Sequence, residues 1–128
     1  MMTPYPDDAL HLTSEWFILP GGEAQVEQAL AVLVQAVLSQ EPDTLAYLVH
    51  RPRAAPSRLQ SLPPGSPQSL LFYEIYRNDA AFLRHVNGPV FQAFVAEQGH
   101  LFIGAEGRSF TTVAFLSQVN GFMRSAPV

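Results

Sequence analysis

Residues 70–94 read LLFYEIYRNDAAFLRHVNGPVFQAF, in which strand-like sequence leads directly into helix-like sequence. Its first eight residues have the branched and aromatic side chains that are typical of a β-strand. Asn78 is a good helix N-cap, and apolar residues at helical spacing follow it. Gly88-Pro89 either kinks that helix or restarts it, because proline is tolerated in a first helical turn. The segment is therefore predicted to be a strand that runs into a helix with almost no turn between them.

The flanking sequence adds three strands and another helix. Strand-like stretches occupy residues 11–19, 44–51 and 110–119. Between the first two, residues 23–40 have the apolar periodicity of an amphipathic helix. The four positions of this apolar stripe are Val26, Leu30, Leu33 and Val37. Residues 52–69 contain five prolines and no periodicity, so a long loop is predicted there.

The order of these elements predicts the fold class. It is β-α-β, a loop and β-α-β, which is typical of an α+β fold, the ferredoxin-like plait. Such a plait has a four-stranded antiparallel sheet with both helices on one face. The strand at 70–77 is apolar on both faces, so the sheet needs a cover on the side opposite its helices. A second copy of the same sheet would supply it, and a homodimer is expected.

The length and amino-acid composition limit the kinds of protein that this chain can be. The length of 128 residues favours a single domain, with a folded core at about 10–119 and a tail at 120–128. Only 14% of residues are charged, which suits a surface partly buried in an oligomer. The net charge of −4, with no Lys and no basic run, argues against a nucleic-acid partner. No apolar stretch is long enough to span a membrane, so a cytoplasmic protein without a membrane partner is predicted.

The segment quoted above resembles the signature of the antibiotic biosynthesis monooxygenase (ABM) domain family. In that family a strand that ends in Glu-x-aromatic leads through a short cap into Ala-Phe-x-x-His and then into a half-helix that contains Phe. The matching residues here are Glu74, Tyr76, Ala81, Phe82, His85 and Phe91. The resemblance extends over about residues 10–119, apart from the proline-rich loop. It implies a homodimer whose sheets form a dimeric α+β barrel, with a cavity between each sheet and its helices.

Known members of the family include cofactor-independent oxygenases of quinols and anthrones, and enzymes that degrade haem. Haem degradation is not expected here: the first strand lacks the family's Asn, and the axial position falls near Phe94 or Val95, which cannot bind iron. No other metal-ligand spacing appears among the four histidines. The resemblance thus implies a monooxygenase that uses molecular oxygen on a small electron-rich aromatic, with no cofactor. The alternative is a non-catalytic dimer that binds a small apolar ligand.

Three residues of the quoted segment are the expected catalytic group. His85 would transfer a proton, Glu74 would orient or charge it, and Tyr76 would bind a substrate oxygen. Each also has an interpretation as a core residue whose polar tip is hydrogen-bonded, and the sequence leaves this choice open. Aromatic residues are expected to bind the substrate. They are Phe72, Trp16, Phe82, Phe91 and Phe94.

The register of the first strand also stays open. The turn at residues 20–22 permits two alignments that differ by one residue, and such a slip reverses every side chain. In one alignment the cavity-facing residues are Ser14, Trp16 and Ile18. In the other they are Glu15, Phe17 and Leu19.

Overall fold

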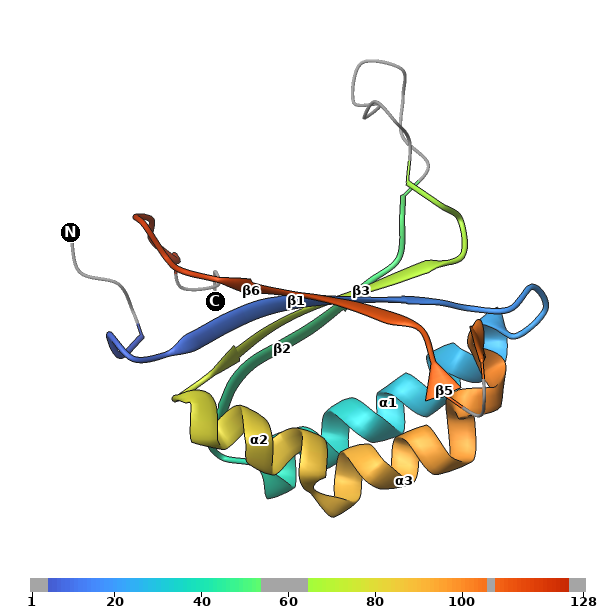
Figure 1. The fold of residues 1–128 in the computed structure, drawn as a ribbon, viewed down its shortest axis with the longest axis horizontal. Coiled ribbons are helices and arrows are strands. Elements are labelled where there is room, and N and C mark those ends of the chain that lie inside the picture. Colours follow the sequence, from blue (N-terminus) through green and yellow to red (C-terminus); the bar gives the residue numbers. More distant parts are fainter. Residues whose placement is uncertain (1–4, 54–64, 106–107, 125–128) are drawn as a thin grey trace.

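A computed structural model describes residues 5–53, 65–105 and 108–124. Its main sheet has four antiparallel strands in the order β2-β3-β1-β6. These strands are β1 (Leu10–Phe17), β2 (Thr44–His50), β3 (Ser69–Tyr76) and β6 (Thr111–Leu116). The helices α1 (Glu23–Gln40), α2 (Asp79–Asn87) and α3 (Pro89–Gln98) all lie on one side of the sheet (Figure 1). The predicted ferredoxin-like α+β plait is confirmed, and most of the predicted loop at 52–69 lies outside the described residues.

Helix α1 packs through the stripe that its sequence predicts. Before it, Gly21 has a φ of +93°, a backbone conformation that glycine adopts without steric cost. The helix then runs to Gln40, and Pro42 prevents its continuation. Its buried side chains are Val26, Leu30, Leu33 and Val37. The residue between helix and proline, Glu41, is thereby held at the junction of α1 and β2.

The quoted segment forms a strand and two helices. The Asn78 side chain accepts a 2.9 Å hydrogen bond from the backbone N–H of Ala81, which caps α2. The chain is extended at Gly88, and α3 starts with Pro89 in its first turn. A Cβ at position 88 would lie 2.5 Å from the carbonyl oxygen of Arg84, so this break requires glycine. Of the two predicted outcomes, the helix therefore restarts.

The N-cap of α2 is open to a direct test. We expect Asn78→Ala to lower the free energy of unfolding by about 1 kcal/mol, because the Ala81 N–H loses its acceptor. Asn78→Ser is the control, since a serine hydroxyl can accept the same bond. Urea denaturation of the three proteins measures the difference. Equal stability of the alanine variant and the native protein would show that the cap contributes nothing.

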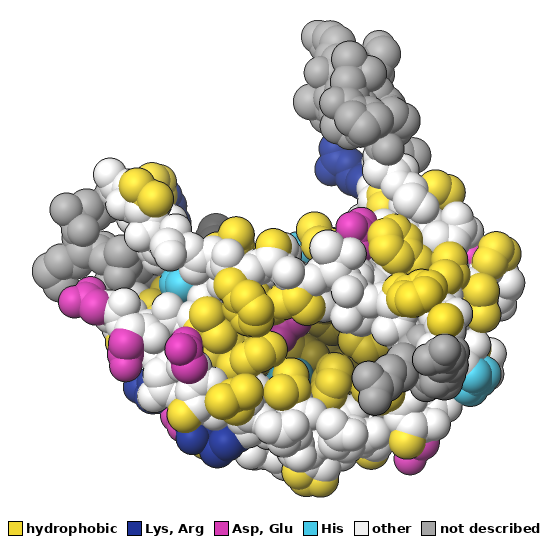
Figure 2. Space-filling model, viewed as in Figure 1, with side chains coloured by type: hydrophobic (Ala, Val, Ile, Leu, Met, Phe, Trp, Pro, Cys, Tyr) yellow, Lys and Arg dark blue, Asp and Glu magenta, His cyan; other side chains and the backbone are white. Residues whose placement is uncertain are grey.

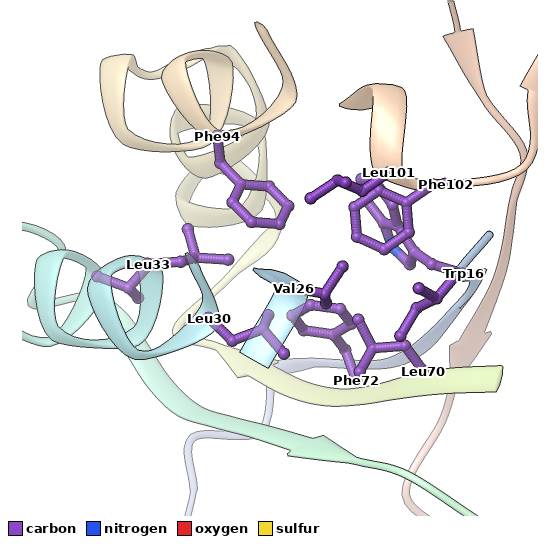
Figure 3. Packing of buried hydrophobic residues seen from close by; sticks show 11 residues of the cluster. Trp16, Val26, Leu30, Leu33, Leu70, Phe72, Phe94, Leu101 and Phe102 are labelled. Carbon is purple, nitrogen blue, oxygen red and sulfur yellow. The ribbon is translucent and has the colours of Figure 1, made fainter. Parts of the chain in front are cut away.

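The main core gathers around Trp16, which is 5% exposed (Figure 3). Ser14 and Trp16 both face the helices, which settles the register of β1 in favour of the first alignment. The indole Nε1–H donates a 2.9 Å hydrogen bond to the Ser14 hydroxyl. Across the core, the ring centroid of Phe102 lies 4.9 Å from that of Trp16. These contacts join the first strand to the segment that follows α3.

Phe102 reaches the core from the segment between α3 and β6. A 3-10 helix (Gly99–Leu101) follows α3. Phe102 then forms an isolated β-bridge with Ile18, and Leu101 accepts a backbone hydrogen bond from Leu19. A separate two-stranded sheet follows, formed by β4 (Gly104–Ala105) and β5 (Arg108–Ser109).

The face of the main sheet opposite the helices is covered by no helix or further strand among the described residues (Figure 1). Tyr5 packs against His11 at one end of this face, with ring centroids 5.9 Å apart. Leu48, Leu71 and Leu116 point to this side, and they are 47%, 38% and 43% exposed. No helix in the described ranges has both the length and the apolarity needed to cross a membrane. On the other side, hydrophobic side chains surround a hollow between sheet and helices (Figure 2).

Candidate functional site

A cavity of about 210 Å³ lies between the sheet and the helices. All five aromatic residues that the sequence predicted for substrate binding line it, namely Phe72, Trp16, Phe82, Phe91 and Phe94. Strand β6 contributes Thr111 and Val113, and the latter is 42% exposed, so the cavity opens along this edge. Acidic and histidine side chains are visible deep in the hollow (Figure 2). Among the lining residues, Glu74 and His85 are the ones with these chemistries.

His85 is 2% exposed and is held by aromatic rings and one carboxylate. Its ring centroid lies 5.4 Å from that of Tyr47 and 5.1 Å from that of Phe91. Its Nδ1 lies 2.6 Å from the Oε1 of Glu41. The sequence had suggested that Glu74 orients or charges His85, and this was wrong: the carboxylate on the imidazole belongs to Glu41. Helix α1 ends at Gln40, and this places Glu41 beside α2, within reach of His85.

The protonation state of His85 follows from these contacts. Burial lowers the pKa of His85, and the Glu41 carboxylate opposes this shift without reversing it. The imidazole is therefore neutral at pH 7. Since a carboxylate can only accept, Nδ1 carries the proton and donates it to Glu41. Nε2 is then a free lone pair, and it forms no hydrogen bond within the described part of the chain. A neutral imidazole in this state can act as a general base.

Glu74 lines the cavity from β3 and is 5% exposed. It accepts a hydrogen bond from the Tyr76 hydroxyl. Burial raises the pKa of Glu74 to about 7; the bond from Tyr76 opposes the rise, and the charge on Glu41 adds to it. Near neutral pH this carboxyl group is thus present in both its protonated and its ionised form. The protonated form can donate a hydrogen bond to a substrate anion.

Tyr76 does not line the cavity, although the sequence predicted that it would bind the substrate there. It is fully buried, is absent from the cavity wall and donates its hydroxyl to Glu74. Burial raises the pKa of Tyr76, so the phenol stays neutral. It is the last residue of β3, and α2 begins soon afterwards and covers it with Phe82, whose ring centroid lies 5.4 Å away. The prediction that Tyr76 binds a substrate oxygen was therefore wrong: its hydroxyl donates a hydrogen bond to Glu74 instead.

Tyr47 is a cavity residue that the sequence reasoning missed. It lines the cavity from β2, opposite Glu74 in the strand pairing. Burial raises the pKa of Tyr47 well above its usual value, and the charges on Glu74 and Glu41 act in the same direction. Its hydroxyl makes no hydrogen bond with any other described residue. Pairing of the strands at 44–51 and 70–77 in the correct register could have identified it.

Metal ligands are not gathered at this site. Within residues 5–53, 65–105 and 108–124, no three His, Cys, Asp or Glu side chains lie together as they would around a metal ion. The cavity wall thus carries a base (His85), a carboxyl group (Glu74) and a phenol (Tyr47), together with the hydroxyls of Ser14 and Thr111.

Comparison with known proteins agrees with this architecture. A candidate antibiotic biosynthesis monooxygenase from Caulobacter crescentus CB15 superposes with a TM-score of 0.70 at 20% identity, over 91% of this chain and 94% of its own. The Pseudomonas aeruginosa protein PA3566 gives 0.66 at 23% identity, over 88% and 96%. A variant of SnoaB, a cofactor-independent oxygenase from Streptomyces nogalater, gives 0.64 at 15% identity, over 89% and 96%. At such identities the likeness concerns the fold.

The family of this protein is identified from its sequence. No curated protein matches it. Residues 10–97, however, match the family model for antibiotic biosynthesis monooxygenase (ABM), and this range includes β1, α1, β2, β3, α2 and nearly all of α3. It contains every residue of the cavity described above except those contributed by β6. The chain therefore belongs to the antibiotic biosynthesis monooxygenase (ABM) family.

Proposed function

We propose that this protein is a cofactor-independent monooxygenase that acts on an electron-rich aromatic such as a quinol. The observation that carries the proposal is the position of His85, a neutral imidazole on the wall of an aromatic-lined cavity. Its Nδ1 is occupied by Glu41, which leaves Nε2 to accept a proton. Catalysis without flavin or metal requires only that the substrate, once deprotonated, can give an electron to oxygen.

The proposed reaction assigns a role to each polar group. His85 Nε2 accepts a proton from a quinol hydroxyl, and the quinolate transfers one electron to O2. The two radicals combine at a ring carbon, and loss of water leaves a hydroxyquinone, so quinol and O2 become hydroxyquinone and water. The Tyr47 hydroxyl and protonated Glu74 donate hydrogen bonds to the developing anion. The apolar walls exclude water, which strengthens these interactions.

The volume of the cavity selects among aromatic substrates. At about 210 Å³ it is smaller than the roughly 300 Å³ at which pockets for drug-sized ligands begin. Rings on several sides, among them Trp16, Phe72 and Phe91, suit the stacking of a flat molecule. We infer that a quinol of one ring fits better than a three-ring anthrone.

The second candidate function is binding without catalysis. One observation favours it: Glu74 and His85 already have partners, Tyr76 and Glu41, as buried polar groups in an inert core also do. In that case the protein binds a small apolar ligand between its aromatic walls.

Oxygen uptake distinguishes the two functions. We expect chelator-treated, flavin-free protein to consume O2 when it is supplied with one-ring quinols, and to form the hydroxyquinone in equal amount. A panel of quinols with different substituents, with an anthrone for comparison, tests the inference about size. Quenching of Trp16 fluorescence by quinols that are bound but not turned over would favour the binding function instead.

We further propose that the protein is a homodimer formed through the outer face of the sheet. The support is the uncovered face that carries Leu48, Leu71 and Leu116. A second copy would remove these side chains from water, and burial of apolar area stabilises association. The low fraction of charged residues, 14%, is consistent with this arrangement.

Sedimentation equilibrium checks the dimer. We expect a mass of roughly twice 14.1 kDa at micromolar concentration, and dissociation when Leu48→Asp introduces charges that the second sheet would bury. Leu38→Asp is the matched control, because Leu38 is 74% exposed on α1, away from that face. A native protein that sediments as a monomer would refute this interface.

A further inference from the structure

His85 lies between two separate hollows. On one side is the cavity described above, and on the other is a surface cleft of about 270 Å³. The cleft is formed by the residues that follow α1 and by the facing parts of α2 and α3, and Glu41 lines it. Among the described residues, His85 is the one that lines both hollows. The imidazole therefore lies between the cavity and the surface cleft.

Glu41 is the polar group on the solvent side of His85. Its side chain is 17% exposed, whereas that of His85 is 2% exposed. Its Oε1 is bonded to His85 Nδ1 at 2.6 Å and accepts a weaker 3.3 Å bond from the Thr44 hydroxyl. Within the described ranges it forms no ion pair with arginine. It thus touches the buried imidazole and also lines the surface cleft.

The nearby acid Asp43 has a different environment. It pairs with Arg77 at 2.7 Å and with Arg84 at 2.8 Å, so this carboxylate is engaged by two arginines, of which Arg84 lines the cleft. These pairs lower the pKa of Asp43, which therefore holds no proton near neutral pH. Two carboxylates that are two residues apart thus have different roles: Asp43 binds arginines, and Glu41 binds the imidazole.

We propose that Glu41 is a proton relay that positions His85 and connects the aromatic-lined cavity with the surface cleft. This inference rests on the proposed function, since it gives the proton removed from the substrate a place to go. Glu41 does not line the cavity, so it acts through His85 and not on the substrate. Neither the family match nor the structural neighbours point to this residue in particular.

The relay is balanced in atoms and charge. The quinol O–H bond breaks as its proton binds His85 Nε2, while the Nδ1–H proton shifts to Glu41 Oε1. The imidazole stays neutral throughout, the quinolate carries the negative charge, and the carboxylate becomes a carboxylic acid. The reverse shift then returns the proton to the peroxide anion formed from quinolate and O2, which allows water to leave and restores the first tautomer. Exchange of the Glu41 proton with solvent takes place in the cleft.

Other groups around His85 do not duplicate this path. Tyr47 from β2 and Tyr76 from β3 face the ring, but burial raises the pKa of both phenols, so they stay protonated. Glu74 lies on the cavity side and is bonded to Tyr76. Arg84 on α2 is bound to Asp43 at the cleft. Glu41 is the group that leads from the ring towards solvent.

The first test needs no turnover. Nitrogen-15 NMR of the imidazole is expected to show His85 with its proton on Nδ1 in the native protein. Glu41→Gln removes the charge that favours imidazolium, so the pKa of His85 should fall further, and the population with the proton on Nδ1 should decrease. Asp43→Asn, the matched control at the same cleft, should change neither. A His85 tautomer and pKa that are the same in Glu41→Gln and the native protein would overturn the proposal.

The second test uses an accepted quinol. Glu41→Gln is expected to lower kcat by about 10- to 100-fold, by analogy with the loss of a hydrogen-bond partner from a metal-bound histidine, with little change in KM. Glu41→Ala should be equally slow, but added acetate, which can enter the vacated cleft, should restore its rate. Restoration of the Glu41→Ala rate by acetate supports a relay, because a packing defect does not depend on a proton carrier. A normal kcat in Glu41→Gln would overturn it.

The two tests separate this inference from the proposed function. If no quinol is oxidised by the native protein, the proposed function fails, and NMR alone still decides whether Glu41 controls the proton on His85. If quinols are oxidised and both Glu41 variants behave like the native protein, the function stands and the relay is refuted.

Discussion

Replacement of His85 by glutamine is expected to lower kcat/KM for an accepted quinol by roughly 10²- to 10⁴-fold, the usual contribution of a general base. Glutamine has a similar length and can still donate a hydrogen bond to Glu41, but it cannot take a proton from the substrate. The loss should therefore appear in turnover, while binding of the quinol and the fold are retained. Oxygen uptake with the purified variant measures it.

Two further variants separate chemistry from packing. His85→Ala leaves a void and an unpaired Glu41, so it should also lower the free energy of unfolding, by about 1–3 kcal/mol. Tyr76→Phe removes a hydroxyl that does not line the cavity; it should cost a similar free energy by leaving Glu74 without its donor, and slow turnover far less than His85→Gln. Normal turnover in His85→Gln would move the base away from residue 85.

The second large effect is a pH dependence of stability caused by Glu74. Its pKa is about 7 in the folded protein and 4.5 in the unfolded chain. Between these values the folded state holds a proton that the unfolded state has lost, so stability falls as the pH rises from 4.5 through 7. The difference amounts to about 3 kcal/mol, since each pKa unit corresponds to about 1.4 kcal/mol.

Comparison with Glu74→Gln isolates this effect. His85 acts in the opposite direction, because its pKa is lowered in the folded state and its contribution is lost as the pH falls through 6.5. Glutamine keeps an acceptor for the Tyr76 hydroxyl and does not titrate. Urea denaturation at a series of pH values should therefore show the native protein losing stability relative to Glu74→Gln as the pH rises from 5 to 8. Parallel curves for the two proteins would contradict the assignment.

The features that the sequence predicted correctly depend on local spacing. The buried stripe of α1, with Val26 and Leu33 among its members, follows from a helical period within one segment. The cap of α2 by Asn78 follows from four consecutive residues. The aromatic walls follow from alternation along β3 and periodicity along α2 and α3, which together place Phe72 and Phe82 on facing surfaces.

The features that it missed depend on contacts between distant segments. Glu41 and His85 are 44 residues apart, and only the packing of α2 beside the end of α1 brings them together. Tyr47 enters the site through the register of β2 on β3, which a bulge between residues 44 and 46 shifts. Alternation assigned Tyr76 to the correct face of the sheet, but it could not show that α2 covers that position. Sequence periodicity shows which residues share one face of a strand or helix. Tertiary packing decides which of those residues line the cavity and which are covered.

The ionisation of a bound quinol in the absence of oxygen tests the central claim most directly. Ultraviolet difference spectra of an anaerobic titration distinguish a quinol from its quinolate, because ionisation of the hydroxyl shifts the absorption to longer wavelength. We expect the native protein to show the quinolate band below the pH at which the free quinol ionises, and His85→Gln to bind the quinol without this band. A bound quinol that stays protonated in the native protein, or a quinolate band of equal size in His85→Gln, would contradict proton abstraction by His85.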